Sequence, residues 1–153
     1  KGASVIEPLD AKDYEKCSNI WNMKAQPLAE KWREEIADGN RLVFVYKING
    51  EFIGEGAVVF ETGDTDYAIP NRRVYVSRMI VKNEYRNRGI DSEILEFLIN
   101  KAKEMGFAEM SIASATPNTA SNARSIPTIP SPAIIPEQKR IPSFVIAFFS
   151  SSV

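Results

Sequence analysis

The chain has 153 residues, of which 44% are hydrophobic and 25% charged. This is typical of one globular domain, and no apolar run is long enough to span a membrane, so we expect no membrane partner. A formal net charge of −1 gives no overall field for nucleic acid, and we expect no nucleic-acid partner. The chain has no histidine and one cysteine, which excludes zinc sites of the histidine or multi-cysteine kind, so we expect no metal.

A strand and two helices are predicted at the start of the chain. Residues 3–7 form the strand, and Asp10 can cap the helix that follows it. Four residues would share one face of this helix: Tyr14, Cys17, Ile20 and Trp21. The second helix covers residues 28–37 and should end at Gly39, because glycine readily adopts the left-handed conformation that closes helices.

A hairpin is predicted next. Two β-rich runs, residues 41–48 and 51–60, flank the pair Asn49-Gly50, and both turn residues tolerate positive φ angles. We therefore expect two antiparallel strands. Residues 61–72 are rich in residues that favour turns and should form a loop.

The most informative stretch covers residues 73–92. It begins as an apolar strand over residues 73–81 and breaks into a polar turn that carries Arg86, Arg88 and Gly89. A helix then begins near Ile90. Backbone N–H groups at a helix N-terminus are unpaired and point outward, and the two arginines add positive charge, so the turn favours a bound phosphate or pyrophosphate. Taken alone this is a weak signal, because arginines in turns are usually only solvated.

The helix after the turn has apolar residues at three- and four-residue spacings and should end at Gly106. A further strand follows over residues 107–113. Because a helix joins it to the strand at residues 73–81, the two strands should be parallel neighbours with a right-handed connection.

The composition changes after about Ala115. Six of the nine prolines lie between Pro117 and Pro142, and Glu137 is the only acidic residue of this tail. The proline-rich part cannot form a regular helix and would make a poor interior strand. The apolar end, S-F-V-I-A-F-F, still has the composition of a strand.

The stretch from residue 74 to 113, together with the order of elements before it, resembles the GCN5-related N-acetyltransferase (GNAT) family. The pyrophosphate-binding signature of that family is Gln or Arg, two residues, Gly, one residue, then Gly or Ala, and residues 86–91 read R-N-R-G-I-D. The resemblance implies an α/β (α+β) fold with a mixed, mostly antiparallel central sheet flanked by helices and a parallel pair around residues 74–81 and 107–113. Residues 1–114 would form an acyl-CoA-binding core, and residues 115–153 an atypical Pro/Ser-rich segment of the same domain.

The resemblance also implies residues that bind acetyl-CoA. Backbone groups at the end of the central strand would hold the pantetheine arm: Met79, Ile80 and Val81. The turn and the start of the helix would hold the pyrophosphate: Arg86, Asn87, Arg88, Gly89, Ile90, Asp91 and Ser92. Asn118 matches the asparagine that follows the next strand in the family.

Two departures from the family pattern concern the same site. Asp91 stands where the signature has Gly or Ala, and a carboxylate there repels an incoming pyrophosphate. In addition, no tyrosine follows Tyr85, although family members often use a later tyrosine to protonate the departing thiolate. The tail therefore has three open explanations, which are a divergent C-terminus, a frame shift in the gene and misassigned residues, and the abrupt change of composition favours the last two.

The expected chemistry is attack by an amine on the acetyl thioester, helped by a base. Tyr75 stands near the position of a catalytic glutamate in some family members, and Glu55 on the neighbouring hairpin strand is the second candidate. Each also has a simpler interpretation, a packing aromatic for Tyr75 and an exposed strand carboxylate for Glu55, which we favour. A base acting through water is the third alternative.

The sequence thus predicts a cytoplasmic N-acetyltransferase that moves an acetyl group from acetyl-CoA to a primary amine of a small molecule or protein. The cytoplasm is favoured because the single cysteine fits a reducing compartment and no signal-like segment opens the chain. Acidic residues on the first helices and in the loop at 61–72 would suit a cationic acceptor. The alternatives are a catalytically impaired acyl-CoA-binding or regulatory module, and a phosphate-binding structural domain unrelated to CoA; a homodimer is left open.

Overall fold

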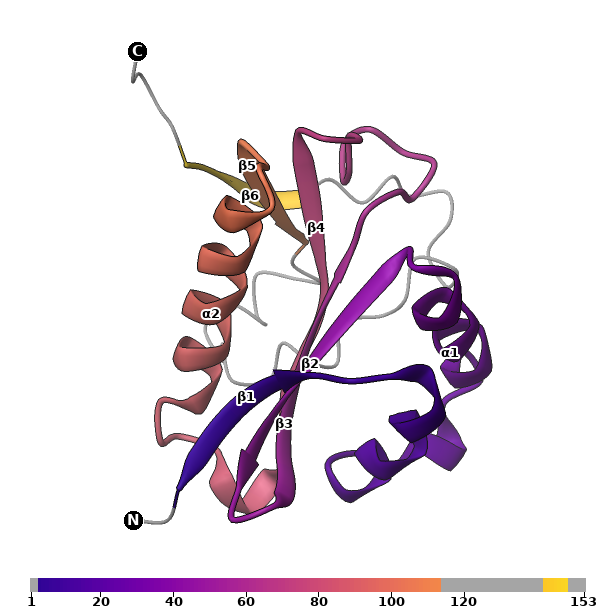
Figure 1. Cartoon of the computed structure of the whole chain (residues 1–153), viewed down its shortest axis with the longest axis vertical. Helices are drawn as coiled ribbons and strands as arrows, with labels where there is room; N and C mark the ends of the chain where they lie inside the picture. Colours follow the sequence, from indigo (N-terminus) through magenta and orange to yellow (C-terminus); the bar gives the residue numbers. More distant parts are fainter. Residues whose placement is uncertain (1–2, 114–141, 149–153) are drawn as a thin grey trace.

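The computed structural model describes residues 3–113 and 142–148, which form a six-stranded sheet with helices on both faces (Figure 1). The strands lie in chain order: β1 (Ser4–Pro8), β2 (Arg41–Ile48), β3 (Glu51–Val59), β4 (Arg73–Val81), β5 (Glu109–Ala113) and β6 (Pro142–Ala147). The helices are α1 (Ala29–Asp38), α2 (Ile90–Glu104) and the 3-10 helices η1 (Ala11–Asn19), η2 (Met23–Ala25) and η3 (Asn83–Tyr85). All neighbouring strands are antiparallel except β4 and β5, which are parallel. The predicted fold class is confirmed.

The predicted turns are confirmed. Asn49 and Gly50 have φ angles of 50° and 84°, which form the tight turn between β2 and β3. Gly39 closes α1 with a φ of 89°, and Gly106 follows α2 with a φ of 91°. None of the helices among the described residues is long and apolar enough to cross a membrane.

The first helix differs from its prediction. Residues Ala11–Asn19 form a 3-10 helix, and Asp10 makes no side-chain cap hydrogen bond, so the predicted cap is wrong. Tyr14, Cys17 and Ile20 are buried and lie three residues apart. This spacing suits a 3-10 helix, which has three residues per turn and brings positions i and i+3 onto one line.

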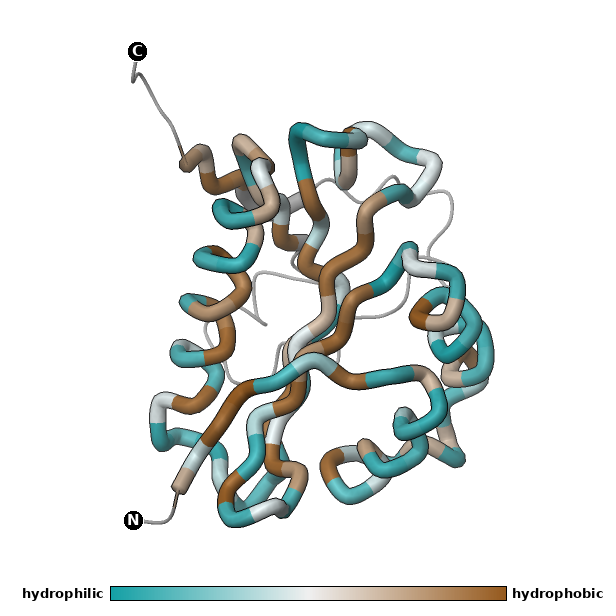
Figure 2. Tube along the Cα trace, viewed as in Figure 1, coloured by the Kyte–Doolittle hydropathy of each residue, from teal (hydrophilic) through white to brown (hydrophobic). Residues whose placement is uncertain are grey.

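The two faces of the sheet carry different layers. α2 covers one face, and η1 and α1 cover the other (Figure 1). The side of α2 next to the sheet carries mostly hydrophobic residues, and its outer side carries mostly hydrophilic ones (Figure 2). Along β2, Phe44 and Tyr46 face α2, whereas Val43 and Val45 face η1 and α1, as the two-residue repeat of a strand requires.

Two glycines in β3 bring α2 close to the sheet. A Cβ at Gly56 would lie 2.6 Å from Cγ2 of Ile94, and a Cβ at Gly54 would lie 3.0 Å from Cδ1 of the same residue. Glycine is therefore required here for close packing of helix on strand. Because side chains alternate along a strand, Glu55 between them points to the opposite face.

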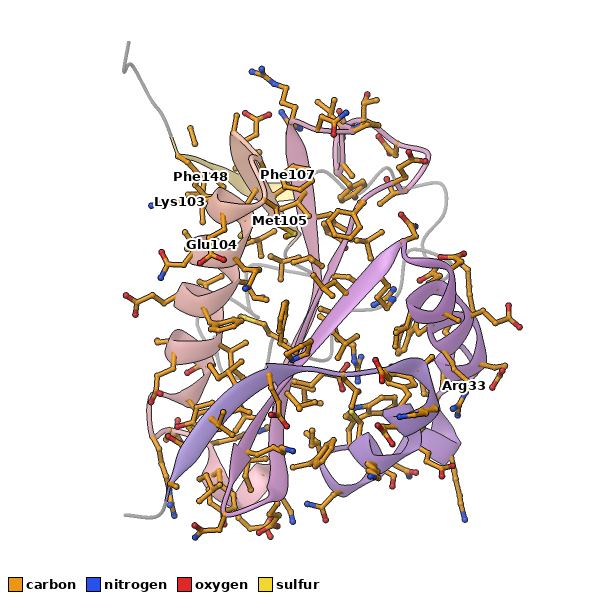
Figure 3. The ribbon with its side chains drawn as sticks, in the orientation of Figure 1. Arg33, Lys103, Glu104, Met105, Phe107 and Phe148 are labelled. Carbon is orange, nitrogen blue, oxygen red and sulfur yellow. The ribbon has the colours of Figure 1, made fainter. Side chains whose placement is uncertain are left out.

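The last strand adds to the sheet edge next to β5. β6 pairs antiparallel with β5, which agrees with the strand composition predicted for the end of the chain. Figure 3 shows Lys103 of α2 beside Phe148, and Lys103 Nζ lies 5.7 Å from the centroid of that ring. Phe107, which precedes β5, stacks on Phe60 at 5.8 Å between ring centroids.

Candidate functional site

Among the described residues, β5 pairs with only the first part of β4. The parallel pairing ends at Val76 opposite Ile112, whereas the pairing with β3 on the other side continues to Val81. A bulge leaves Ser77 without a partner in the β3 register. Among the described residues, β4 beyond Val76 therefore has a strand on one side only, and its other edge can offer backbone N–H and C=O groups to a ligand. The residues expected to hold a pantetheine arm lie in this segment: Met79, Ile80 and Val81.

The turn between β4 and α2 presents a row of backbone donors. Asn87 and Gly89 have positive φ angles of 65° and 81°, and α2 has no side-chain cap. Within the described part of the chain, no acceptor engages the N–H groups of residues 87–91. A Cβ built at Gly89 would meet no atom within 4 Å, so the space beside the turn is open. Free donors at a helix N-terminus are suited to a phosphate group.

Both predicted arginines lie beside these donors. Arg86 Nε donates to the carbonyl oxygen of Val81 at 3.3 Å, which joins the turn to the end of β4. The guanidinium group of Arg88 lies 5.0 Å from the ring centroid of Tyr85. The turn thus combines open N–H groups with two cationic side chains, as an anion site requires.

Asp91 already uses one donor of the first helical turn. Its Oδ1 accepts a hydrogen bond from the N–H of Ser92 at 2.9 Å. The side chain of Ile90 is buried in the core, so this residue can contribute only its backbone. Asn118 lies outside the described residues.

Glu55 lies on the opposite face from α2, inside a polar cluster. Its side chain is fully buried, so the interpretation as an exposed strand carboxylate is wrong. Oε1 accepts a hydrogen bond from Trp21 Nε1 at 2.7 Å, and Oε2 lies 3.8 Å from Nε of Arg78. The burial follows from the strand register, because η1 covers the face to which Glu55 points.

Tyr75 packs in a different cluster from Glu55. Its side chain is buried, and its ring contacts the ring of Tyr67 edge to face, with 5.1 Å between the centroids. Both residues belong to a small apolar cluster with Val59 and Ala68. The geometry agrees with a packing aromatic, and a role for Tyr75 as a base stays a prediction.

Burial changes the protonation of two groups near Glu55. Desolvation and, after it, the negative charge of Glu55 raise the pKa of the Tyr14 hydroxyl. The same two causes, in the same order, raise the pKa of the Cys17 thiol. Both groups are therefore neutral across the physiological range.

The cluster also contains atoms without partners. Three buried side-chain atoms make no hydrogen bond with the described residues: Tyr14 Oη, Glu55 Oε2 and Arg78 Nε. Buried polar groups are nearly always paired, so these three atoms have hydrogen-bonding capacity that an ordered water or a ligand would satisfy.

Sequence reasoning missed Arg78, Trp21 and Trp32 as parts of this cluster. Arg78 is a charged residue in the interior of a mostly apolar strand, and its guanidinium carbon lies 4.3 and 4.8 Å from the ring centroids of Trp21 and Trp32. A charged residue inside an apolar strand was the available signal.

The sequence profile of the Acetyltransferase (GNAT) family matches residues 6–124. The chain belongs to this family. No curated protein matches the chain in sequence. Among the described residues, no group of three acidic, cysteine or histidine side chains could hold a metal ion.

Solved structures share the GNAT fold with this chain at low sequence identity. An aminoglycoside N-acetyltransferase in complex with CoA is 15% identical, with a TM-score of 0.65, and the match covers 86% of this chain and 89% of that one. A ribosomal-protein-alanine N-acetyltransferase from Brucella melitensis is 16% identical, with a TM-score of 0.60 and coverages of 79% and 86%. An N-acetyltransferase from Staphylococcus aureus is 20% identical, with a TM-score of 0.61 and coverages of 80% and 80%.

Proposed function

We propose that this GNAT protein transfers the acetyl group of acetyl-CoA to a primary amine of a small molecule or protein. One observation carries the proposal: the open edge of β4 leads directly into a turn with free N–H donors and two arginines. An extended chain with a pyrophosphate at one end complements this arrangement, because the edge supplies backbone hydrogen bonds and the turn supplies positive charge.

Each part of the site takes a part of the donor. Backbone groups of Met79, Ile80 and Val81 bind the pantetheine arm. The free N–H groups of residues 87–91 and the side chains of Arg86 and Arg88 bind the pyrophosphate, with Gly89 permitting close approach. Asn118 stays a predicted contact.

The reaction forms a carbon–nitrogen bond and breaks the carbon–sulfur bond of the thioester. The amine must lose a proton, and CoA leaves as a thiolate that takes one up. We propose Glu55 as the base, because no described residue donates a hydrogen bond to its Oε2 and Arg78 lies beside it. Since Glu55 is fully buried, the proton reaches it through water. Tyr75 is the second candidate.

A catalytically impaired acyl-CoA-binding or regulatory module is the alternative function. The hydrogen bond from Ser92 to Asp91 favours it, because the carboxylate occupies a donor that a pyrophosphate needs. The absence of a tyrosine after Tyr85 points the same way.

The decisive experiment measures thiol release from acetyl-CoA in the presence of a panel of primary amines. The proposal predicts release that depends on one class of amine and falls at least tenfold in Glu55→Gln, with acetyl-CoA binding retained. Binding of acetyl-CoA without release for any amine would support the binding module instead.

The other expectations also remain proposals. We propose that the protein acts in the cytoplasm, where its free thiol, Cys17, stays reduced. We also propose that residues 1–114 are the acyl-CoA-binding core and residues 115–153 an atypical segment of the same domain. A homodimer and the absence of nucleic-acid and membrane partners stay predictions.

A further inference from the structure

Two arginines near Trp32 differ sharply in their hydrogen bonding. Arg41 lies 5.2 Å from the Trp32 ring centroid and donates to Glu35 at 2.9 Å and to Ser77 at 3.1 Å. Arg78 lies against Trp32 and also against Trp21, yet it makes no hydrogen bond with any described residue. Its nearest carboxylate oxygen is 3.8 Å away, which is too long for a hydrogen bond.

The open guanidinium of Arg78 is held in place. Its side chain is 10% exposed, and the two indole rings restrict its orientation. A buried charged donor without a partner is costly, and a planar fork of N–H groups pairs best with a carboxylate. Arg78 has an ion-pair partner at 3.8 Å but no hydrogen-bond acceptor among the described residues. A fixed guanidinium in this state indicates an anionic group supplied by another molecule.

Arg78 lies where an acceptor would approach. It precedes Met79, the first residue of the backbone segment proposed to hold the pantetheine arm, and its side chain lies on the face covered by η1 and α1. Its Nε side is turned to Glu55 Oε2. One positive and one negative group thus stand side by side, each with an open hydrogen-bonding position.

We propose that Arg78 binds a carboxylate of the acceptor, so that the acceptor is a free amino acid or a similar small molecule with a carboxylate next to its amine. This inference rests on the proposed acetyl transfer. The carboxylate meets the guanidinium, and the amine lies toward Glu55, which receives its proton. A zwitterion complements this pair, whereas a polycation is repelled by Arg78.

The acidic side chains near the first helices do not favour a cationic acceptor over this one. Glu35 pairs with Arg41 at 2.9 Å and with Lys31 at 3.3 Å. Glu30 pairs with Arg33 at 3.3 Å. Two of the acidic side chains that the sequence offers to a cationic amine, Glu30 and Glu35, are therefore neutralised within the protein.

The test uses matched acceptors. Free L-amino acids with small, apolar, aromatic, acidic and basic side chains are each compared with their C-terminal amides and with their decarboxylated amines, and thiol release is measured for all. For the amino acids that react, we expect kcat/KM to exceed that of the amide by about tenfold to a hundredfold, the range of a charged bidentate contact. The amine of an amino-acid amide is less basic than that of the free amino acid and is more often deprotonated. Without recognition of the carboxylate, the amide would therefore be the more reactive acceptor.

Two arginine variants distinguish binding of the acceptor carboxylate from an effect on protein stability: Arg78→Met and Arg41→Met. Arg78→Met should abolish the preference for the acid through a higher KM, with acetyl-CoA affinity unchanged by calorimetry. Arg41→Met removes a second arginine on the same indole and should lower the melting temperature without changing the ratio of acid to amide. Equal or better use of amides or decarboxylated amines by the wild-type protein would overturn the inference while leaving acetyl transfer intact.

A protein that binds acetyl-CoA but releases no thiol contradicts the proposed function instead. In that case calorimetry with the same amino acids and amides, in the presence of CoA, decides the inference. Tighter binding of the acids, lost in Arg78→Met, would support it. Binding of neither, or an ordered water alone at Arg78 and Glu55 in a crystal soaked with the amino acids, would overturn it.

Discussion

Asp91 is the residue at which the local structure opposes the proposed ligand. Its carboxylate accepts the N–H of Ser92 at 2.9 Å, so it satisfies a helix N-terminus that a pyrophosphate would otherwise satisfy. A carboxylate suits the positive end of the α2 dipole. The same charge repels a phosphate. Asp91 therefore stabilises the free protein but lowers its affinity for a pyrophosphate.

Asp91→Gly should therefore bind acetyl-CoA more tightly. At about 5 Å and an effective dielectric of roughly 20 to 80, the repulsion removed is about 1 to 3 kcal/mol, and one donor is freed. Isothermal calorimetry measures the change. Asp91→Asn keeps the hydrogen-bond acceptor but removes the charge. Its affinity therefore shows how much of the gain comes from the lost repulsion and how much from the freed N–H of Ser92. Unchanged or weaker affinity in Asp91→Gly would count against the pyrophosphate at this turn.

Cys17 should make stability depend on alkaline pH. Burial and then the charge of Glu55 raise the pKa of its thiol in the folded state, so above the unfolded pKa of about 8.5 the unfolded chain loses a proton that the folded protein keeps. The folded state then binds more protons, and the free energy of unfolding must fall as pH rises, by about 1.4 kcal/mol per pH unit for one group.

Denaturant unfolding of the wild-type protein and of Cys17→Ala between pH 7.5 and about 10 tests this pH dependence. The variant should be less stable at pH 7.5, because a buried side chain is lost, but its stability should fall less steeply above the pKa of a free thiol. Equal slopes in the two proteins would show that the Cys17 pKa is not raised.

The conformation of the turn at residues 86–92 could be predicted from the sequence more readily than the cluster around Glu55. Arg86, Arg88 and Gly89 are close together in the chain, so their placement follows from local structure alone. Glu55, Trp21 and Arg78 come from separate elements, and their meeting depends on which face of the sheet η1 covers. The alternation of Gly54, Glu55 and Gly56 does indicate that Glu55 faces away from the close-packed helix, and this pattern was the usable signal.

Among the elements, α2 packs unusually close to β3. Ile94 and Leu98 of α2 are fully buried, and they occupy the space where side chains at Gly54 and Gly56 would lie. The position of α2 fixes that of its N-terminus, and therefore of the turn that precedes it. Tyr46 of β2 adds a hydrogen bond to Glu93 of the first helical turn at 3.2 Å.

Gly56→Ala should destabilise the protein by about 1 to 3 kcal/mol, the usual cost of overpacking. The new Cβ would lie 2.6 Å from Cγ2 of Ile94, and a branch atom next to the helix backbone cannot move away easily. Gly54→Ala is the matched control and should cost less, because its Cβ meets the flexible end of the same side chain at 3.0 Å.

Urea unfolding of both variants measures the difference. In an Ile94→Ala background, Gly56→Ala should cost less free energy of unfolding than it does in the wild type, since the obstructing atom is already removed. If Gly56→Ala were as stable as the wild type, α2 would have to lie farther from β3 than the structure places it.

Most elements could be predicted because their signals are local. The Asn49-Gly50 turn and the glycine after α1 fix conformations that other residues rarely adopt. The 3-10 form of η1 could not be predicted from its composition, because an apolar spacing of three residues is also compatible with an α-helix. The structure resolves this ambiguity.

At the scale of the whole molecule, the order of elements carried more information than any single motif. The turn at residues 86–91 is a weak signal alone, but it follows a strand that is parallel to the next one and antiparallel to a hairpin. A ligand can reach the backbone of β4 only where no strand pairs with that edge, and among the described residues the pairing with β5 ends at Val76. The composition after residue 114 gave no comparable guide to the second half of the site.

Ligand-induced stabilisation is the sharpest test of an acetyl-CoA site in this protein. The melting temperature of the protein is measured with acetyl-CoA, CoA, ATP and NAD at equal concentrations, since any ligand that binds only the folded state raises it. We predict that acetyl-CoA and CoA raise the melting temperature, that ATP and NAD raise it much less, and that Arg88→Ala reduces the CoA effect. No shift with acetyl-CoA or CoA, or an equal shift with all four ligands, would contradict an acetyl-CoA site at the turn between β4 and α2.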